Sequence, residues 1–333
     1  MNARVACRLL AAALAFLSID ASASQYVAGR GLRLLDDRLV LGGYLAAGAS
    51  LLDEEPKEFK LDDLSAFVTY RVNDELLAFS EMELEDAIHL DEDGFDVGRR
   101  IVSLERLYLE WQPRQELRLR LGQMLTPIGI WNRVHAAPLV WTTSRPLATE
   151  AFFDTGVTGA QLDASARWRD LDFVATLFGQ PDGHIDATDA RHRMRRGIGA
   201  RLQVGRIEAW HAGVSALRYR DDRDRRWHGL FGADLLLDRE PWEVWSEAVV
   251  NDPDGGPTIW GLYLQAAYHL GHGFYPVVRY EHVHLEGVAR NPIVAGLAFK
   301  PAPNVILKLE GILGREGLGA GGNGAEASVA ILF

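Results

Sequence analysis

Cysteine is almost absent from this chain of 333 residues. The single one, Cys7, lies ahead of a short apolar run from Leu9 to Leu17. A lipid-acylated cysteine would follow such a run, so we do not expect Cys7 to carry a lipid. If the first 23 residues are removed, the remaining chain has no thiol, which excludes disulfides and thiolate metal sites.

Long apolar runs are also missing. Hydrophobic residues make up 48% of the chain, yet no segment after residue 23 approaches the roughly 18 to 20 consecutive apolar residues of a transmembrane helix. The sequence therefore excludes insertion into a membrane as helices. A closed β-barrel also satisfies every backbone polar group inside a bilayer, and it needs segments of about ten alternating residues.

The chain has no excess of positive charge. Its formal net charge is −11, which argues against a nucleic-acid partner. This total does not fix the charge of a pore, because external loops and lumen contribute to it together. His282 and His284 share one face of a predicted strand, but no third ligand is identifiable. We therefore expect neither a metal site nor a cofactor.

The N-terminal residues have the pattern of a secretory signal peptide. Two arginines precede the apolar run, and Ala21-Ser22-Ala23 supplies small residues for cleavage. We expect residues 1–23 to direct export and residues 24–37 to form an N-terminal periplasmic segment. A barrel is then expected over residues 38–333.

Apolar and polar residues alternate in sixteen segments, separated by short turns and longer gaps in alternation. The even count predicts that both termini lie on the periplasmic side of a bacterial outer-membrane barrel. The predicted strands are 38–50, 61–72, 76–87, 101–112, 116–124, 156–166, 171–179, 194–204, 207–219, 227–238, 241–250, 258–269, 273–284, 292–300, 304–314 and 324–333.

The last predicted strand ends on an aromatic residue, Phe333, which shares a face with Val329 and Ile331. Outer-membrane barrels commonly end in this way. We therefore expect Phe333 to be a signal for the barrel-assembly machinery, and we expect outer-membrane lipid and lipopolysaccharide to surround the barrel. For any single strand, a soluble β-sandwich would explain the alternation as well.

Residues 125–154 interrupt the regular spacing of the predicted strands. This gap is long for a loop and rich in Trp, Ile, Leu and Val, so it is not a solvated tail. It is the third external loop in the order of predicted strands. We expect it to fold inward, against the barrel wall, and to narrow the channel.

The segment LGQMLTPIGIWNRVHAAPLVWTTSRPL, residues 121–147, resembles the loop region of outer-membrane porins related to the phosphate-selective porin O and P group. The resemblance implies a sixteen-stranded barrel that assembles as a homotrimer. It does not extend to phosphate selectivity, because that group uses lysine-rich constrictions. The present chain has only four lysines, and none lies in the long loop.

The candidate pore residues come from the long loop and from the predicted inner wall. In the loop, Arg133, His135 and Arg145 are expected at the constriction, with Trp131 and Trp141 anchoring the loop. On the wall, opposite charges would set a transverse field that sorts small solutes; the candidates are Arg118, Arg120, Glu81 and Glu83. Alternatively, these charges are solvated wall residues joined by salt bridges, without selectivity.

The pattern as a whole predicts a passive porin for small hydrophilic solutes or ions. One alternative is a hydrolase built on a barrel. However, His211 and Ser215 lie four residues apart, about 13 Å along a strand, which is too far for a hydrogen bond. A plugged structural or adhesive barrel is the other alternative, because the long loop could fill the lumen.

Overall fold

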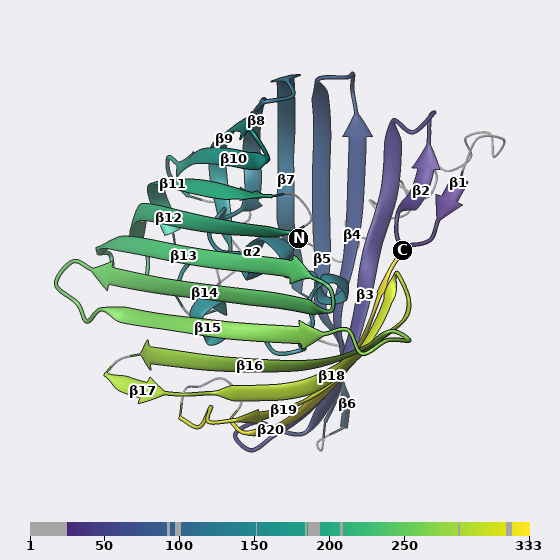
Figure 1. Ribbon diagram of the computed structural model, residues 1–333, viewed down its shortest axis with the longest axis vertical. Coiled ribbons are helices and arrows are strands. Elements are labelled where there is room, and N and C mark those ends of the chain that lie inside the picture. The colour runs from purple at the N-terminus through teal and green to yellow at the C-terminus, as the bar shows by residue number, and fades with distance from the viewer. Residues whose placement is uncertain are drawn as a thin grey trace.

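The computed structural model describes residues 25–91, 94–96, 101–150, 152–183, 185, 194–206, 209–285, 287–317 and 322–333. The predicted signal peptide, residues 1–23, lies outside these ranges. Within them, sixteen strands of at least nine residues form one antiparallel sheet, and β20 pairs with β3 to close it into a barrel (Figure 1). The predicted all-β barrel is confirmed.

The sixteen barrel strands follow the predicted segments closely, with ends that differ by a few residues. They are β3 (Leu39–Leu52), β4 (Glu58–Arg71), β5 (Leu76–Asp91), β7 (Ile101–Arg114), β8 (Leu117–Leu125), β9 (Gly156–Trp168), β10 (Leu171–Gln180), β11 (Met194–Arg206), β12 (Trp210–Asp221), β13 (Trp227–Arg239), β14 (Trp242–Pro253), β15 (Ile259–Tyr268), β16 (Phe274–Leu285), β18 (Ile293–Ala302), β19 (Val305–Leu313) and β20 (Gly324–Leu332).

Four shorter strands extend the sheet at the two ends of the barrel. The strands β1 (Gln25–Val27) and β2 (Gly31–Leu34) form a hairpin, and β2 pairs with the beginning of β3. The later residues of β3 pair on the same edge with β20. At the end that carries the longer loops, β6 (Gly94–Asp96) pairs with β5 and β17 (Val288–Arg290) with β16. Strands of three or four residues are too short for their alternation to be recognised in a sequence.

The two faces of the sheet differ as a membrane barrel requires. In β19, Leu307 and Leu309 point outward and are 42% and 61% exposed, whereas Lys308 and Glu310 point inward and are buried. Leu121 of β8 and Phe231 of β13 belong to the same apolar outer surface. An apolar outer face suits lipid, and a polar inner face suits a lumen.

The C-terminal residue completes the closure of the barrel. The backbone N–H of Phe333 donates to the carbonyl of Gly43 at 2.8 Å, and Gly43 donates back at 3.0 Å. A side chain on Gly43 would lie against the Phe333 ring, so the ring covers the glycine on the outer face. The role of Phe333 in assembly stays a prediction.

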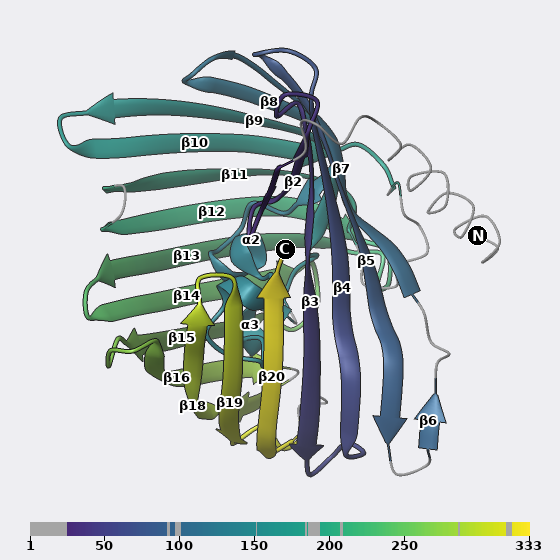
Figure 2. The same ribbon diagram turned by 90° about the vertical axis from the view of Figure 1, so that its right-hand side faces the viewer.

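Three helical turns interrupt the connection between β8 and β9: α2 (Trp131–Val134), η2 (Ala137–Leu139) and α3 (Leu147–Glu150). Figure 2 shows α2 and α3 inside the space that the strands enclose. The third long loop therefore folds inward, as predicted. Among the described residues, no helix has the length and apolarity to cross a membrane.

Leu121→Arg should lower the free energy of unfolding by about 2 to 4 kcal/mol, because it would place a charge on the lipid face near the middle of β8. Arg120→Leu, one residue away on the inner face, should cost much less, since Glu110 keeps Arg118 as a partner. Urea unfolding in lipid vesicles measures both values. Equal losses would show that the faces of β8 are assigned wrongly.

Candidate pore constriction

The long loop packs on one side of the barrel interior. Ile128 and Trp131 are 0% and 2% exposed, and they belong to an apolar cluster that includes Trp245, Val249 and Tyr263 of the wall. The rings of Trp131 and Trp245 meet edge to face, 6.1 Å between centroids. The loop is thus fixed against β14 and β15 by a core of its own.

The second tryptophan of the loop lies further along the same wall. The ring of Trp141 is 4.5 Å from that of Tyr275 on β16, and its indole N–H donates to Glu243 on β14 at 2.6 Å. The ammonium of Lys300 lies 4.0 Å from the centre of the Trp141 ring. Both tryptophans predicted as anchors therefore lie between loop and wall.

Acidic side chains of the wall accept hydrogen bonds from the loop backbone. An irregular segment lacks the backbone hydrogen bonds that neighbouring strands make with each other. The bonds from the wall take their place and satisfy amides that would otherwise be buried without partners. The pairs are Glu247 with the amide of Trp131 (2.8 Å), Glu281 with that of Leu147 (2.7 Å), and Glu310 with those of Thr143 and Ser144 (2.8 Å each).

Basic side chains of the wall and of a neighbouring loop donate to loop carbonyls in the same way. The pairs are Arg279 with Ser144 (2.9 Å), Lys308 with Ala137 (3.0 Å) and Thr142 (3.1 Å), and Arg315 with Arg145 (2.7 Å). Arg279 also forms a fully buried ion pair with Glu281 at 2.9 Å. The charges on this arc of the wall hold the loop and do not line an open path.

Gly129 permits the hydrogen bond from the amide of Trp131 to Glu247. Its φ of +69° lies in the left-handed region, and a side chain there would overlap the carboxylate of Glu247. Only glycine lets the loop turn this closely around the carboxylate.

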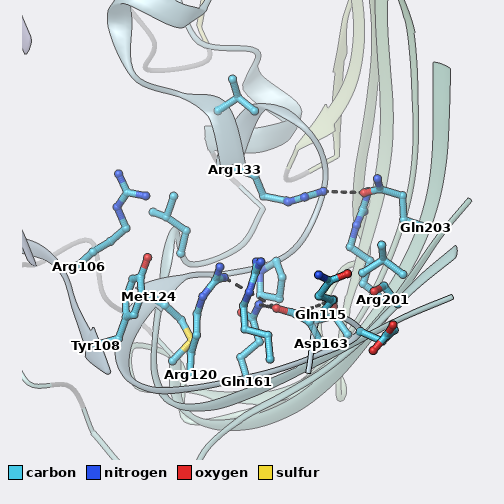
Figure 3. A pocket seen from close by; sticks show the side chains of 18 residues that line it. Arg106, Tyr108, Gln115, Arg120, Met124, Arg133, Gln161, Asp163, Arg201 and Gln203 are labelled. Carbon is cyan, nitrogen blue, oxygen red and sulfur yellow. Dashed lines mark hydrogen bonds and ion pairs between the residues drawn. The ribbon is translucent and has the colours of Figure 1, made fainter. Parts of the chain in front are cut away.

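A cavity of about 550 Å³ remains between the loop and the opposite arc of the wall, from β7 to β11 (Figure 3). Five arginines line it, together with two acidic residues, Glu116 and Asp163, several neutral polar side chains and a few apolar groups. The arginines are Arg106, Arg118, Arg120, Arg133 and Arg201.

Four of these arginines come from the wall and have acidic partners there. Arg118 and Arg120 share Glu110, at 3.3 Å and 2.7 Å. Arg106 is paired with Glu81, which is 1% exposed, and Arg201 is paired with Asp234, which is 6% exposed. The acids of Arg106 and Arg201 do not line the cavity, whereas both arginines do, and Arg201 is itself buried with its partner.

Arg133 and His135 connect the loop to the two ends of this arc. The Arg133 guanidinium extends from α2 and donates to Gln203 on β11 at 3.0 Å (Figure 3). Nε2 of His135 lies 2.8 Å from Glu105 on β7. Burial by itself lowers the pKa of His135, but the Glu105 carboxylate outweighs it and raises this pKa above its usual value.

Apart from Arg118, Arg120 and Arg133, the candidate residues do not line this cavity. The Arg145 guanidinium donates to Asn132 at 2.9 Å and to the carbonyl of Thr149 at 3.0 Å, so it joins parts of the loop. It borders a smaller recess of about 270 Å³ near β3 and β4. Glu83 is buried and accepts a hydrogen bond from Tyr44 at 2.9 Å.

Sequence reasoning overlooked the neutral residues of the cavity, among them Tyr108, Gln161 and Gln203. Only their alternation phase, which places them inward with the arginines, could have indicated them. It also overlooked Gly129, because its function depends on the path of the loop.

No family model matches the chain, and no curated protein matches it. Solved structures of outer-membrane proteins do match its fold. OmpF of Salmonella typhi has a TM-score of 0.64 and 12% identity, covering 90% of this chain and 99% of that one. An anion-selective porin from Comamonas acidovorans has a TM-score of 0.58 and 12% identity, covering 88% of this chain and 98% of that one. OmpT of Vibrio cholerae, in its trimer form, has a TM-score of 0.59 and 13% identity, covering 89% of this chain and 99% of that one.

Gly129→Ala should lower the free energy of unfolding by about 1 to 3 kcal/mol, because it adds backbone strain and displaces the loop from Glu247. Gly255→Ala is the matched control, since Gly255 has a φ of +72° but open space around its Cα. Denaturant unfolding compares the two. If both variants lose the same stability, strain alone explains the effect and the contact with Glu247 contributes nothing.

The chain has the fold of the outer-membrane porins, with an inward-folded third long loop beside an arginine-lined cavity.

Proposed function

We propose that this protein is an outer-membrane porin that lets small hydrophilic solutes diffuse passively, without a chemical step. The observation that carries the proposal is the arginine-lined cavity, which the loop narrows without filling. A second cavity of about 750 Å³ shares Gln115, Glu116, Ser165, Val174 and Gln203 with the first and continues toward the short turns of the barrel. Together they mark the path for solutes.

We also propose that the path favours anions. The side chain of Arg118 is 39% exposed and Arg133 is exposed, whereas Glu81, the acidic partner of Arg106, is buried and does not line the cavity. Positive charge in a narrow, poorly screened space attracts anions. The similar fold of an anion-selective porin supports this selectivity. We assign to Arg118 the role in anion preference that we expected for Arg145, because Arg145 is bonded within the loop.

The resemblance of residues 121–147 to the phosphate-selective porin O and P group supports the same function, without its phosphate selectivity. Both this resemblance and the trimer form of a structural neighbour support a homotrimer. We further propose that residues 1–23 direct export and that Phe333 is recognised by the barrel-assembly machinery. The inserted barrel would then contact outer-membrane lipid and lipopolysaccharide.

The absence of enzymatic activity is part of the proposal. Ser215 is buried, and its hydroxyl has no hydrogen-bond partner among the described residues, so it lacks the adjacent base that a nucleophile needs. An esterase and protease assay on the folded protein tests this point, and turnover that depends on Ser215 would contradict it.

The protein should form ion-conducting channels in planar bilayers, and deletion of residues 130–146 should raise the single-channel conductance. The deletion removes most of the loop that divides the lumen. A folded variant that inserts with unchanged conductance would show that the loop does not limit the current.

Neutralising Arg118 and Arg133 together, each to Gln, should shift the reversal potential in a salt gradient toward cation preference. Arg239→Gln is the control, because Arg239 is exposed and outside both cavities. An unchanged reversal potential in the double variant would contradict the proposed anion preference.

A further inference from the structure

The inner wall carries a row of aromatic side chains where a water-filled lumen would favour polar ones. Tyr44, Phe67, Phe79 and Tyr108 lie on the adjacent strands β3, β4, β5 and β7. The distances between successive ring centroids are 5.9, 6.2 and 5.2 Å. Phe79 and Tyr108 face each other directly in the sheet and are stacked, 26° between ring planes.

The aromatic row is on the luminal face of the sheet. The Tyr44 hydroxyl donates to the inward-pointing Glu83, and Phe67 is paired in the sheet with the inward-pointing Glu81. Phe67 and Phe79 are only half-buried. Tyr44 is buried, and Tyr108 packs against the apolar cluster of the loop, so the middle of the row is its less covered part.

Two guanidinium groups lie over these rings and join the row to the cavity. The Cζ atom of Arg106 is 4.9 Å from the centre of the Phe79 ring and 5.9 Å from that of Phe67. The Cζ atom of Arg120 is 5.3 Å from the Tyr108 ring. Arg106, Arg120 and Tyr108 all line the cavity, and Figure 3 shows Arg106 and Tyr108 side by side.

The end of β8 and the loop that follows it supply a second apolar surface to the same cavity, formed by Met124 and Leu125 of β8 and by Pro127 and Val134 of the loop. A path for hydrated inorganic ions needs no such surface. A solute with a flat apolar ring and a negative group would use both parts of the cavity: the ring at Tyr108 and the apolar side chains, the negative group at the arginines. A volume of about 550 Å³ is within the range of sites for small molecules.

We propose that this cavity binds small aromatic carboxylates as they pass through the channel. The carboxylate interacts with Arg118 and Arg133, and the ring packs beside Tyr108, whose own ring is held in place by stacking on Phe79. This inference rests on the proposed porin function, and it adds the solute class. Its test distinguishes a failure of the solute class from a failure of the channel.

The test measures block of the chloride current of the whole protein in planar bilayers by added benzoate. Benzoate should reduce the current in a saturable way that gives a dissociation constant. Acetate has the charge without the ring, cyclohexanecarboxylate has a ring without aromatic faces, and benzamide has the aromatic ring without the charge. All three should block more weakly than benzoate.

Phe79→Leu and Tyr108→Leu should each weaken benzoate block about three- to tenfold, the range expected for the loss of one aromatic contact. Tyr108→Phe keeps the ring and should keep the affinity. Phe231→Leu removes an aromatic side chain from the outer face and should change nothing.

A chloride current without saturable benzoate block would overturn the proposed solute class and leave the porin function intact. The same conclusion follows if cyclohexanecarboxylate blocks as strongly as benzoate, or if both leucine variants retain wild-type affinity; the row would then only support the wall. If no chloride current is observed, the porin function fails first. The ligand comparison uses the unaltered protein, so it stands even if a variant does not fold.

Discussion

The structure depends on how a long irregular segment satisfies its backbone inside a barrel. A strand obtains its hydrogen bonds from its neighbours, but the loop from β8 to β9 lies in the lumen without a ladder. Buried amides and carbonyls without partners are costly. The wall supplies those partners as full charges, with Glu247, Glu281 and Glu310 accepting and Arg279 and Lys308 donating.

This constraint divides the inner wall into two arcs with different tasks. From β14 to β19, acids and bases are buried under the loop and bonded to its backbone or to each other. From β7 to β11, arginines line a cavity, and the Arg133 side chain of the loop reaches across to this arc through its bond to Gln203. The arginine-lined cavity and the docked loop are therefore two consequences of one distribution of charge.

Most of the fold could be predicted because a period of two residues marks every barrel strand, and because an apolar loop of this length needs a surface to cover it. Leu121 and Arg120 are assigned to opposite faces by alternation alone. Alternation predicts that a charged side chain points into the barrel, but it does not predict which group that side chain bonds to. Glu247 and Arg201 both point inward, yet one holds the loop and the other lines the cavity. The loop path decides this, and no local pattern encodes that path. Arg145 shows the same limit, since its partners Asn132 and Thr149 depend on how the loop turns back on itself.

The central claim, that the loop borders the conduction path, can be tested with a single introduced cysteine, because Cys7 is the only natural one. Val134 lines the cavity from the loop. In a Cys7→Ser background, a charged thiol reagent added to Val134→Cys channels should lower the single-channel current. The same reagent should have no effect on Asp222→Cys, which lies in the exposed loop between β12 and β13. An unchanged current after complete labelling of Val134→Cys would contradict the account.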